Sequence, residues 1–146
     1  MIEAFSSHGS ILAGEPAHIL LAEDDEEFRA LLALVLAGDG YAVDQVPDGT
    51  AFLQKVGEQS NCDLIITDIR MPGASGLDVV SRLRCRGSRI PVIMLTAFSD
   101  ESTQQRALLL GATLFHKPFD LDDLRTAVLN TLTHGPRMSG EELAAG

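Results

Sequence analysis

Short apolar runs alternate with longer amphipathic stretches along the chain from residue 17 onward. A short apolar run is typical of a buried β-strand, whereas apolar residues that recur every three to four positions are typical of a helix with one buried face. The two patterns follow one another in strict alternation. The predicted strands are residues 18–22, a strand that starts with residues 41–43, and residues 64–67, 91–95 and 113–116.

The amphipathic stretches predict five helices. In the first, the apolar positions follow the spacing i, i+3, i+4, i+7 and i+8, and they are Phe28, Leu31, Leu32, Val35 and Leu36. The other four helices are expected to begin at side chains that commonly cap helix N-termini, which are Asp48, Ser75, Ser99 and Asp120. The helix that Ser99 opens is expected to close at Gly111. The last helix is predicted to bury Leu121, Leu124, Val128, Leu129 and Leu132.

Strict alternation with short connections predicts parallel strands joined by right-handed crossovers, with helices on both faces of the sheet. The predicted fold class is therefore α/β, a doubly wound five-stranded parallel sheet with five helices. At this size we expect the flavodoxin-like strand order 2-1-3-4-5. The domain is predicted to span residues 17–134. Residues 1–16 and 135–146 are expected to be flexible tails.

The composition narrows the classes of function. The chain has 146 residues, of which 45% are hydrophobic, and this suits one globular domain with a sizeable core. Its net charge is −10, from 21 acidic and 11 basic residues. That balance argues against a nucleic-acid surface, which needs a basic patch to neutralise phosphates.

The same sequence carries no signal for export or membrane insertion. Its apolar stretches are far shorter than the roughly 18 residues of a membrane span. The N-terminal segment lacks the basic region and apolar core of a secretory signal. Cys62 and Cys85 belong to no motif, so we expect reduced thiols and a cytoplasmic location.

Five reactive or charged side chains are predicted to meet at one edge of the sheet. In an open α/β sheet, ligands bind beyond the carboxyl ends of the strands. The first, third, fourth and fifth strands deliver there Glu23, Asp24, Asp68, Thr96 and Lys117. Each residue alone has an ordinary explanation, since acidic residues cap helices and Asp is common in turns. Their joint placement at the ends of neighbouring strands favours a functional site.

The three carboxylates predict a site for a hard cation. Carboxylates a few ångströms apart repel one another unless a positive charge neutralises them. Mg²⁺ prefers oxygen ligands, so Glu23, Asp24, Asp68 and a loop carbonyl just after Asp68 are candidate ligands. A zinc site is not expected, because the cysteines are not paired and the histidines are scattered at positions 8, 18, 116 and 134.

A carboxylate beside such a cation can attack phosphorus and form an aspartyl phosphate, so Asp68 is the candidate nucleophile. The transferred phosphoryl group needs its three outer oxygens stabilised. We expect Mg²⁺ to hold one of them and Lys117 another. The hydroxyl of Thr96, together with the backbone amide of Ala97, would hold the third.

At these residues the sequence resembles the receiver domain of two-component response regulators. The resemblance covers about residues 17–133 and rests on ILLAEDD, DLIITDIRMPGASG, PVIMLTA and HKPF, in that order. It implies that Asp68 is the phosphoacceptor, Glu23 and Asp24 the acidic pair, and Lys117 the phosphate-pairing cation. Asp24 and the backbone carbonyl of Arg70 would bind Mg²⁺. The resemblance also implies a cis peptide bond between Lys117 and Pro118.

The resemblance further implies the partners. A histidine kinase or histidine phosphotransfer protein would donate the phosphoryl group, and Thr96 would act as the switch hydroxyl. A downstream protein would bind the face formed by the fourth helix, the fifth strand and the fifth helix, and a homodimer could form there. The chain would catalyse its own modification rather than act as a turnover enzyme. It would be a stand-alone receiver, or a fragment of a longer regulator.

Two features depart from or add to the usual pattern. From Gly111 to Lys117 the chain is one residue shorter than receivers usually are. The family places an aromatic side chain that takes part in the switch three residues before the lysine, and in this chain that position is Leu114. If the position of this switch aromatic is counted from Gly111 instead, it is Phe115, which we favour. In addition, bulky Phe98 follows Thr96 closely, and we expect it to shield the phosphoryl group and prolong its lifetime.

Other functions remain open at this point. A phosphatase of the haloacid-dehalogenase type also uses an aspartyl nucleophile and Mg²⁺, but it needs a second Asp where this chain has Arg70. A flavodoxin-like electron carrier would need a phosphate-binding loop where this chain has the acidic block 23–27. A degenerate receiver used only for binding is the third alternative, and the presence of Asp68, Thr96 and Lys117 argues against it.

Overall fold

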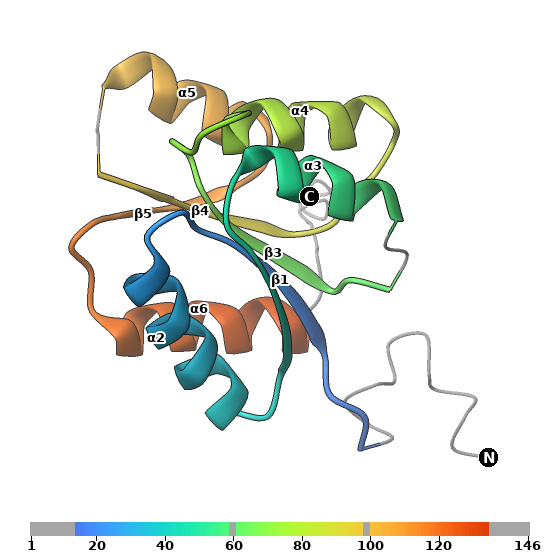
Figure 1. The fold of residues 1–146 in the computed structure, drawn as a ribbon, viewed down its shortest axis with the longest axis vertical. Helices are drawn as coiled ribbons and strands as arrows, with labels where there is room; N and C mark the ends of the chain where they lie inside the picture. Colours follow the sequence, from blue (N-terminus) through green and yellow to red (C-terminus); the bar gives the residue numbers. More distant parts are fainter. Residues whose placement is uncertain (1–13, 59–60, 98–99, 135–146) are drawn as a thin grey trace, which may run out of the picture.

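The computed structural model describes residues 14–58, 61–97 and 100–134. These residues form one sheet of five parallel strands in the order β2-β1-β3-β4-β5 (Figure 1). The strands are β1 His18–Ala22, β2 Ala42–Val46, β3 Leu64–Asp68, β4 Val92–Thr96 and β5 Thr113–His116. The predicted fold class and strand order are confirmed.

Five helices cover both faces of the sheet in the described residues; the first four connect consecutive strands, and the fifth follows the last strand. They are α2 Glu26–Gly38, α3 Gly49–Glu58, α4 Gly76–Cys85, α5 Glu101–Leu109 and α6 Leu121–His134. Helices α2 and α6 lie on one face, and α3, α4 and α5 lie on the other (Figure 1). The predicted tails fall largely on residues 1–13 and 135–146, which lie outside the described residues, so the domain limits 17 and 134 stay a prediction.

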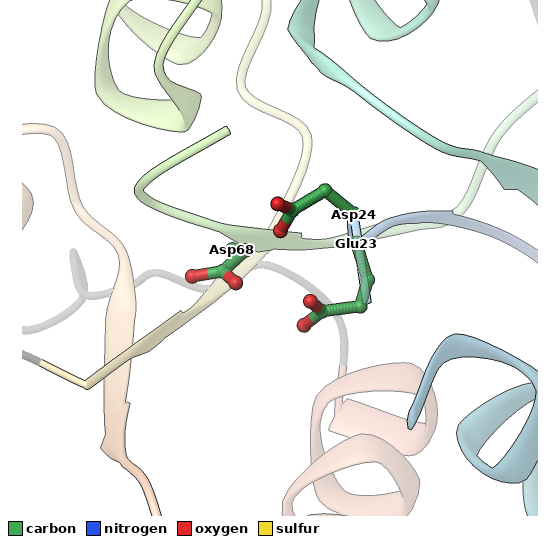
Figure 2. A group of neighbouring side chains, drawn as sticks. All are labelled: Glu23, Asp24 and Asp68. Atoms are coloured by element: carbon green, nitrogen blue, oxygen red, sulfur yellow. The ribbon is translucent and has the colours of Figure 1, made fainter. Parts of the chain in front are cut away.

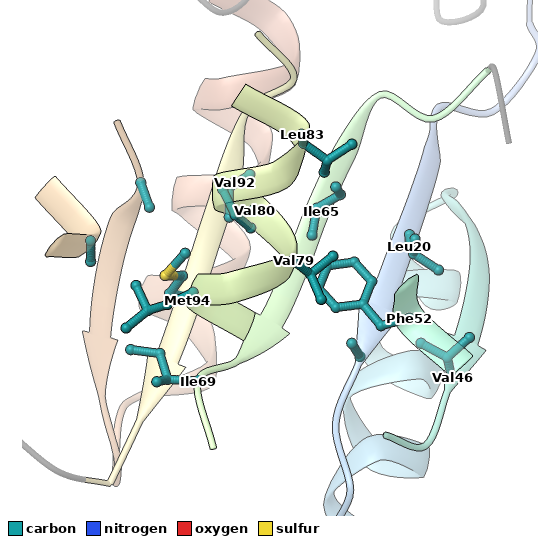
Figure 3. Close-up of a cluster of buried hydrophobic side chains, with 14 residues drawn as sticks. Leu20, Val46, Phe52, Ile65, Ile69, Val79, Val80, Leu83, Val92 and Met94 are labelled. Atoms are coloured by element: carbon teal, nitrogen blue, oxygen red, sulfur yellow. The ribbon is translucent and has the colours of Figure 1, made fainter. Parts of the chain in front are cut away.

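Strands β3 and β4 form the centre of the core, and all five residues of each are buried. Alternate residues of the strands point to opposite faces, so two hydrophobic clusters form. The cluster under α3, α4 and α5 includes Phe52, Ile65 and Met94 (Figure 3). The cluster under α2 and α6 includes Leu36, Ile66 and Leu124. Burial on both faces explains why these strands read as continuous apolar runs.

Helix caps confirm most of the predicted boundaries. The side chain of Asp48 accepts a hydrogen bond from the backbone amide of Ala51, and that of Ser75 accepts one from Asp78. Asp120 likewise accepts one from the amide of Asp122. The fourth helix differs, because Asp100 caps it through the amide of Thr103, so α5 begins at Glu101. Ser99, the predicted cap, lies outside the described residues.

Three details of the predicted pattern were wrong. The second strand begins at Ala42 and not at Tyr41, because Ala42 pairs with His18, the first residue of β1. Leu31 and Leu129 were expected to be buried, but both are exposed. They lie at the margins of their helices' apolar stripes.

Neither cysteine takes part in a disulfide. Cys62 is half-buried, and burial raises the pKa of its thiol to about 11. A thiol with such a pKa holds its proton at neutral pH, so Cys62 is a poor nucleophile. Cys85 is exposed at the end of α4.

Candidate functional site

The register of the sheet brings the predicted site residues to one edge. Ala22 is level with Thr67, so the residues that follow them, Glu23 and Asp68, emerge side by side from β1 and β3. Across the next pairs, Asp68 is level with Leu95 of β4, and Thr96 is level with His116 of β5. Lys117 follows His116 directly. Glu23, Asp68, Thr96 and Lys117 therefore lie at the same edge of the sheet, as the sequence predicted.

The three carboxylates form a compact cluster (Figure 2). One oxygen from each of Glu23, Asp24 and Asp68 lies within 4.8 Å of the others. Glu23 is fully buried and Asp68 nearly so, whereas Asp24 is exposed. Burial raises the pKa of Glu23, and the charge of Asp68 adds to that increase, although a hydrogen bond from the Asp25 amide opposes it. The cluster thus has one solvent-facing side, at Asp24.

Lys117 reaches into this cluster. Its Nζ atom donates to Oδ2 of Asp68 at 2.9 Å and to Oε1 of Glu23 at 3.0 Å. Burial alone would lower the pKa of Lys117, but its hydrogen bonds to Asp68 and Glu23 and their charges raise it overall. The ammonium group therefore stays charged across the neutral range. The peptide bond between Lys117 and Pro118 is cis, as the resemblance implied.

The loop after Asp68 is held close to the site by two glycines. Gly76 lies against the backbone carbonyl of Asp68, and a Cβ atom there would clash with that carbonyl. Gly73 has a φ of +91° and packs against Thr50, a place that only glycine fills without strain. The loop is anchored further by a hydrogen bond from the amide of Gly49 to the carbonyl of Pro72, at 2.8 Å. Arg70, whose carbonyl is a predicted metal ligand, is exposed within this loop.

The fourth strand supplies Thr96 and Ala97. Thr96 is buried at the end of β4, and its carbonyl accepts the amide of Lys117 at 2.7 Å. Ala97 is exposed just beyond the strand. Both residues lie at the same edge as Asp68, one strand away. Phe98, which we expected to shield the site, lies outside the described residues.

The two candidates for the switch aromatic lie on opposite faces of the sheet. Leu114 packs against the cluster under α3, α4 and α5, whereas Phe115 packs against the cluster under α2 and α6. The rings of Phe115 and Phe119 are 5.5 Å apart. The assignment of Phe115 as the switch aromatic stays a prediction, and this packing does not favour it, because only Leu114 faces the side that α5 covers.

Sequence patterns missed three residues that surround the site. Phe28 lies with its ring centroid 5.0 Å from Nζ of Lys117, and the rings of Phe28 and Phe119 are 5.9 Å apart. Arg29 donates to the backbone carbonyl of Glu23 at 2.9 Å. The apolar period of α2 identified Phe28 as a core residue, and no local signal connects it to Lys117.

The charges of the cluster suit a hard divalent cation. Glu23, Asp24 and Asp68 bring three carboxylates, while Lys117 contributes a single positive charge among the described residues. The remaining negative charge and the purely oxygen donor set are what Mg²⁺ prefers. The exposed position of Asp24 gives a cation access to the cluster. The donors present therefore fit the cation that the sequence predicted.

Comparison with known proteins identifies a single family along almost the whole described chain. Residues 19–129 match the response regulator receiver domain. The transcriptional regulatory protein FixJ of Azorhizobium caulinodans is 36% identical over 128 residues, which are 87% of this chain and 59% of FixJ. This chain spans about half the length of several curated transcriptional regulators that it matches.

Shorter relatives match along nearly their full length. The sporulation initiation phosphotransferase F of Bacillus subtilis is 35% identical over 111 residues, which are 75% of this chain and 89% of that protein. The structure of the response regulator TrrA from Thermotoga maritima, in complex with Mg²⁺-BeF, superposes with a TM-score of 0.69 at 32% identity. That match covers 78% of this chain and 97% of TrrA. Within the described ranges, no helix has the length and apolar character needed to cross a membrane.

Proposed function

The chain belongs to the response regulator receiver domain family of two-component phosphorelays, and from this premise we propose that Asp68 accepts a phosphoryl group in a Mg²⁺-dependent step. The observation that carries the proposal is the contact of Lys117 with both Asp68 and Glu23, at the edge where Asp24 adds a third carboxylate. The name of the TrrA structure, which includes Mg²⁺-BeF, supports the choice of cation.

The proposed donor is a phosphohistidine of a histidine kinase or histidine phosphotransfer protein. One oxygen of Asp68 forms the new bond to phosphorus while the bond from phosphorus to the histidine nitrogen breaks. The nitrogen keeps the bonding electrons and takes up a proton. The loop glycines and the buried strand β3 fix the direction of Asp68, so little of the barrier is spent on orienting it.

The other residues stabilise the charge of the transferred group. Glu23, Asp24, Asp68 and the carbonyl of Arg70 would hold Mg²⁺, which supplies positive charge to the phosphoryl oxygens when it is bound. Lys117 would move its second contact from Glu23 to a phosphoryl oxygen while it stays near Asp68. The hydroxyl of Thr96 and the amide of Ala97 would bind the third oxygen.

In this reaction the chain itself receives the phosphoryl group, so we propose that it catalyses only its own modification and is not a turnover enzyme. Phosphorylation would draw the Thr96 hydroxyl toward Asp68 and free space at the end of β4. Leu114, which packs on the α5 side of the adjacent strand β5, would follow that shift. The change would reach the surface formed by α5, β5 and α6.

A downstream protein would bind that surface in one of its two states. Leu108 and Leu109 of α5 are both exposed and offer the apolar area that a partner would cover. A homodimer through the same surface is the alternative occupant. Sedimentation of the phosphorylated protein separates the two, since only a homodimer raises the mass without added partner.

The phosphoacceptor is tested with acetyl phosphate and intact-mass spectrometry. Wild-type protein should gain one phosphoryl group in the presence of Mg²⁺ and none when the cation is chelated. The Asp68→Asn variant should gain none under either condition. Equal labelling of wild type and Asp68→Asn, or no labelling of wild type, would refute the proposal.

A further inference from the structure

The ammonium group of Lys117 has a third neighbour besides its two carboxylates. The face of the Phe28 ring lies 5.0 Å from Nζ, within the range of a cation–π contact. The side chain of Lys117 is 23% exposed, so water screens this contact only in part. Phe28 belongs to the first turn of α2, far from Lys117 in the sequence.

Two more rings hold Phe28 in place. Phe119 packs edge-on against Phe28, with ring centroids 5.9 Å apart, and Phe115 packs edge-on against Phe119 at 5.5 Å. The three rings come from α2, from the segment between β5 and α6 and from β5, and all pack against the cluster under α2 and α6. Edge-on pairs of this kind fix ring orientation beyond what apolar burial does.

We propose that Phe28 is a positioning residue for Lys117, and that Phe119 and Phe115 support its ring. This inference deepens the proposed function and rests on it. During the proposed phosphoryl transfer, Lys117 must stay directed at Asp68 while both of its carboxylate partners form new bonds. Glu23 would bind a cation, and Asp68 would bond to phosphorus. A ring face attracts a cation without accepting a directed hydrogen bond, so it can hold the ammonium group near the site while those bonds change.

The chain has two lysines, Lys55 and Lys117, and this makes the contact directly measurable. A ring face shifts the NMR signals of protons above it upfield. In wild-type protein we expect the side-chain methylene signals next to Nζ of Lys117 to be shifted upfield relative to those of Lys55. The measurement needs neither variants nor activity. Coincident signals for the two lysines would overturn the proposal.

Variants test the effect on the reaction. Phe28→Leu removes the ring face but keeps an apolar side chain, and it should lose the upfield shift. Its phosphorylation by acetyl phosphate with Mg²⁺ should slow by about 3- to 30-fold. Phe28→Tyr keeps the ring face and should retain both the shift and a rate within about twofold of wild type.

A control separates positioning from loss of stability. Phe52 is a fully buried ring in the cluster on the opposite face of the sheet. Phe52→Leu should lower the melting temperature while leaving the Lys117 shift and the phosphorylation rate close to wild type, when the rate is measured well below the transition.

The outcomes are distinct. An unchanged rate in Phe28→Leu, or equal slowing in Phe28→Tyr and Phe28→Leu, would overturn the positioning role even though wild type is phosphorylated. A wild type that takes up no phosphate would instead overturn the proposed function, and the position of the Lys117 signals would still decide whether the ring holds the ammonium group.

Discussion

At the carboxyl ends of β1 and β3, Glu23 and Asp68 are buried and both contact Lys117, whereas helix α5 has a single buried residue, Ala107. Helix α5 also exposes Leu108 and Leu109. In contrast, α4 on the same face buries five residues. The site is thus held by several interactions at once, and α5 is held by few.

This difference matches two different tasks. A phosphoryl transfer step depends on groups that keep one geometry, because misplacement of a reacting group raises the barrier. A signalling surface depends on an element that shifts at low free-energy cost, and such elements have few buried contacts. Under the proposed function, one sheet would carry both, joined through β4 and β5.

The largest effect is expected from removing the positive charge of the Lys117 side chain. Lys117→Gln removes the positive charge that contacts Asp68 and Glu23, so we expect phosphorylation by acetyl phosphate to slow by about 100-fold or more. Lys55→Gln is the matched control, because Lys55 lies on α3 and should leave the rate unchanged. Comparable rates for the two variants would show that the charge of Lys117 matters no more to phosphorylation than the charge of a lysine outside the site.

The next effect concerns stability and compares two helical leucines. Leu36 of α2 has no exposed surface, whereas Leu109 of α5 is 86% exposed. We expect Leu36→Ala to lower the free energy of unfolding by about 3 kcal/mol. Leu109→Ala should change it by less than about 0.5 kcal/mol. Urea unfolding measures both, and a large loss from Leu109→Ala would show that α5 is packed more tightly than its exposure indicates.

A smaller effect is expected in the pH dependence of the metal-free protein. Burial raises the pKa of Glu23 above its ordinary value of 4.5, so the folded state binds this proton more tightly than the unfolded state. The free energy of unfolding should therefore fall as the pH rises from 4.5 through the raised pKa. The carboxylates of Asp39 and Asp100, whose pKa values are lowered, affect stability below pH 3.8 and do not contribute to this decline.

Glu23→Gln tests this assignment. The variant should flatten the decline in stability above pH 4.5, as followed by thermal unfolding at a series of pH values. Added Mg²⁺ should stabilise the wild type more at higher pH, since a cation binds the deprotonated carboxylates. A profile with the same slope in wild type and variant would assign the pH dependence to another group.

The smallest effect is expected from surface ion pairs on the two faces. Arg125 of α6 donates two hydrogen bonds to Asp39 at the end of α2, at 2.8 and 2.9 Å. Arg106 of α5 reaches Asp78 of α4 at 3.5 Å, with both side chains more than half exposed. Arg125→Gln should lower the melting temperature slightly at low salt, and Arg106→Gln less. Both effects should vanish in concentrated salt.

Much of the fold and the core of the site could be predicted from the sequence, because both depend on local patterns. Apolar runs locate the strands, and parallel order places the residues after them at one edge. That is enough to bring Glu23, Asp68, Thr96 and Lys117 together. The length of β2 was not predictable in this way, because an edge strand exposes polar residues such as Asp44 and loses the apolar pattern.

The parts that escaped prediction depend on how side chains from distant segments pack. The position of Phe28 near Lys117 depends on how α2 packs against the segment after β5, and the apolar period of the helix does not encode that packing. The faces occupied by Leu114 and Phe115 follow from the register of β5, which a count from Gly111 cannot supply.

The central claim is that Asp68 itself carries the phosphoryl group. Borohydride reduces an acyl phosphate at its carboxyl carbon to an alcohol, so the modified residue can be located by peptide sequencing in a mass spectrometer. After treatment with acetyl phosphate and Mg²⁺, we expect the reduced residue to be position 68 and no other carboxylate. Reduction at Glu23 or Asp24 instead, or at no residue, would contradict the account.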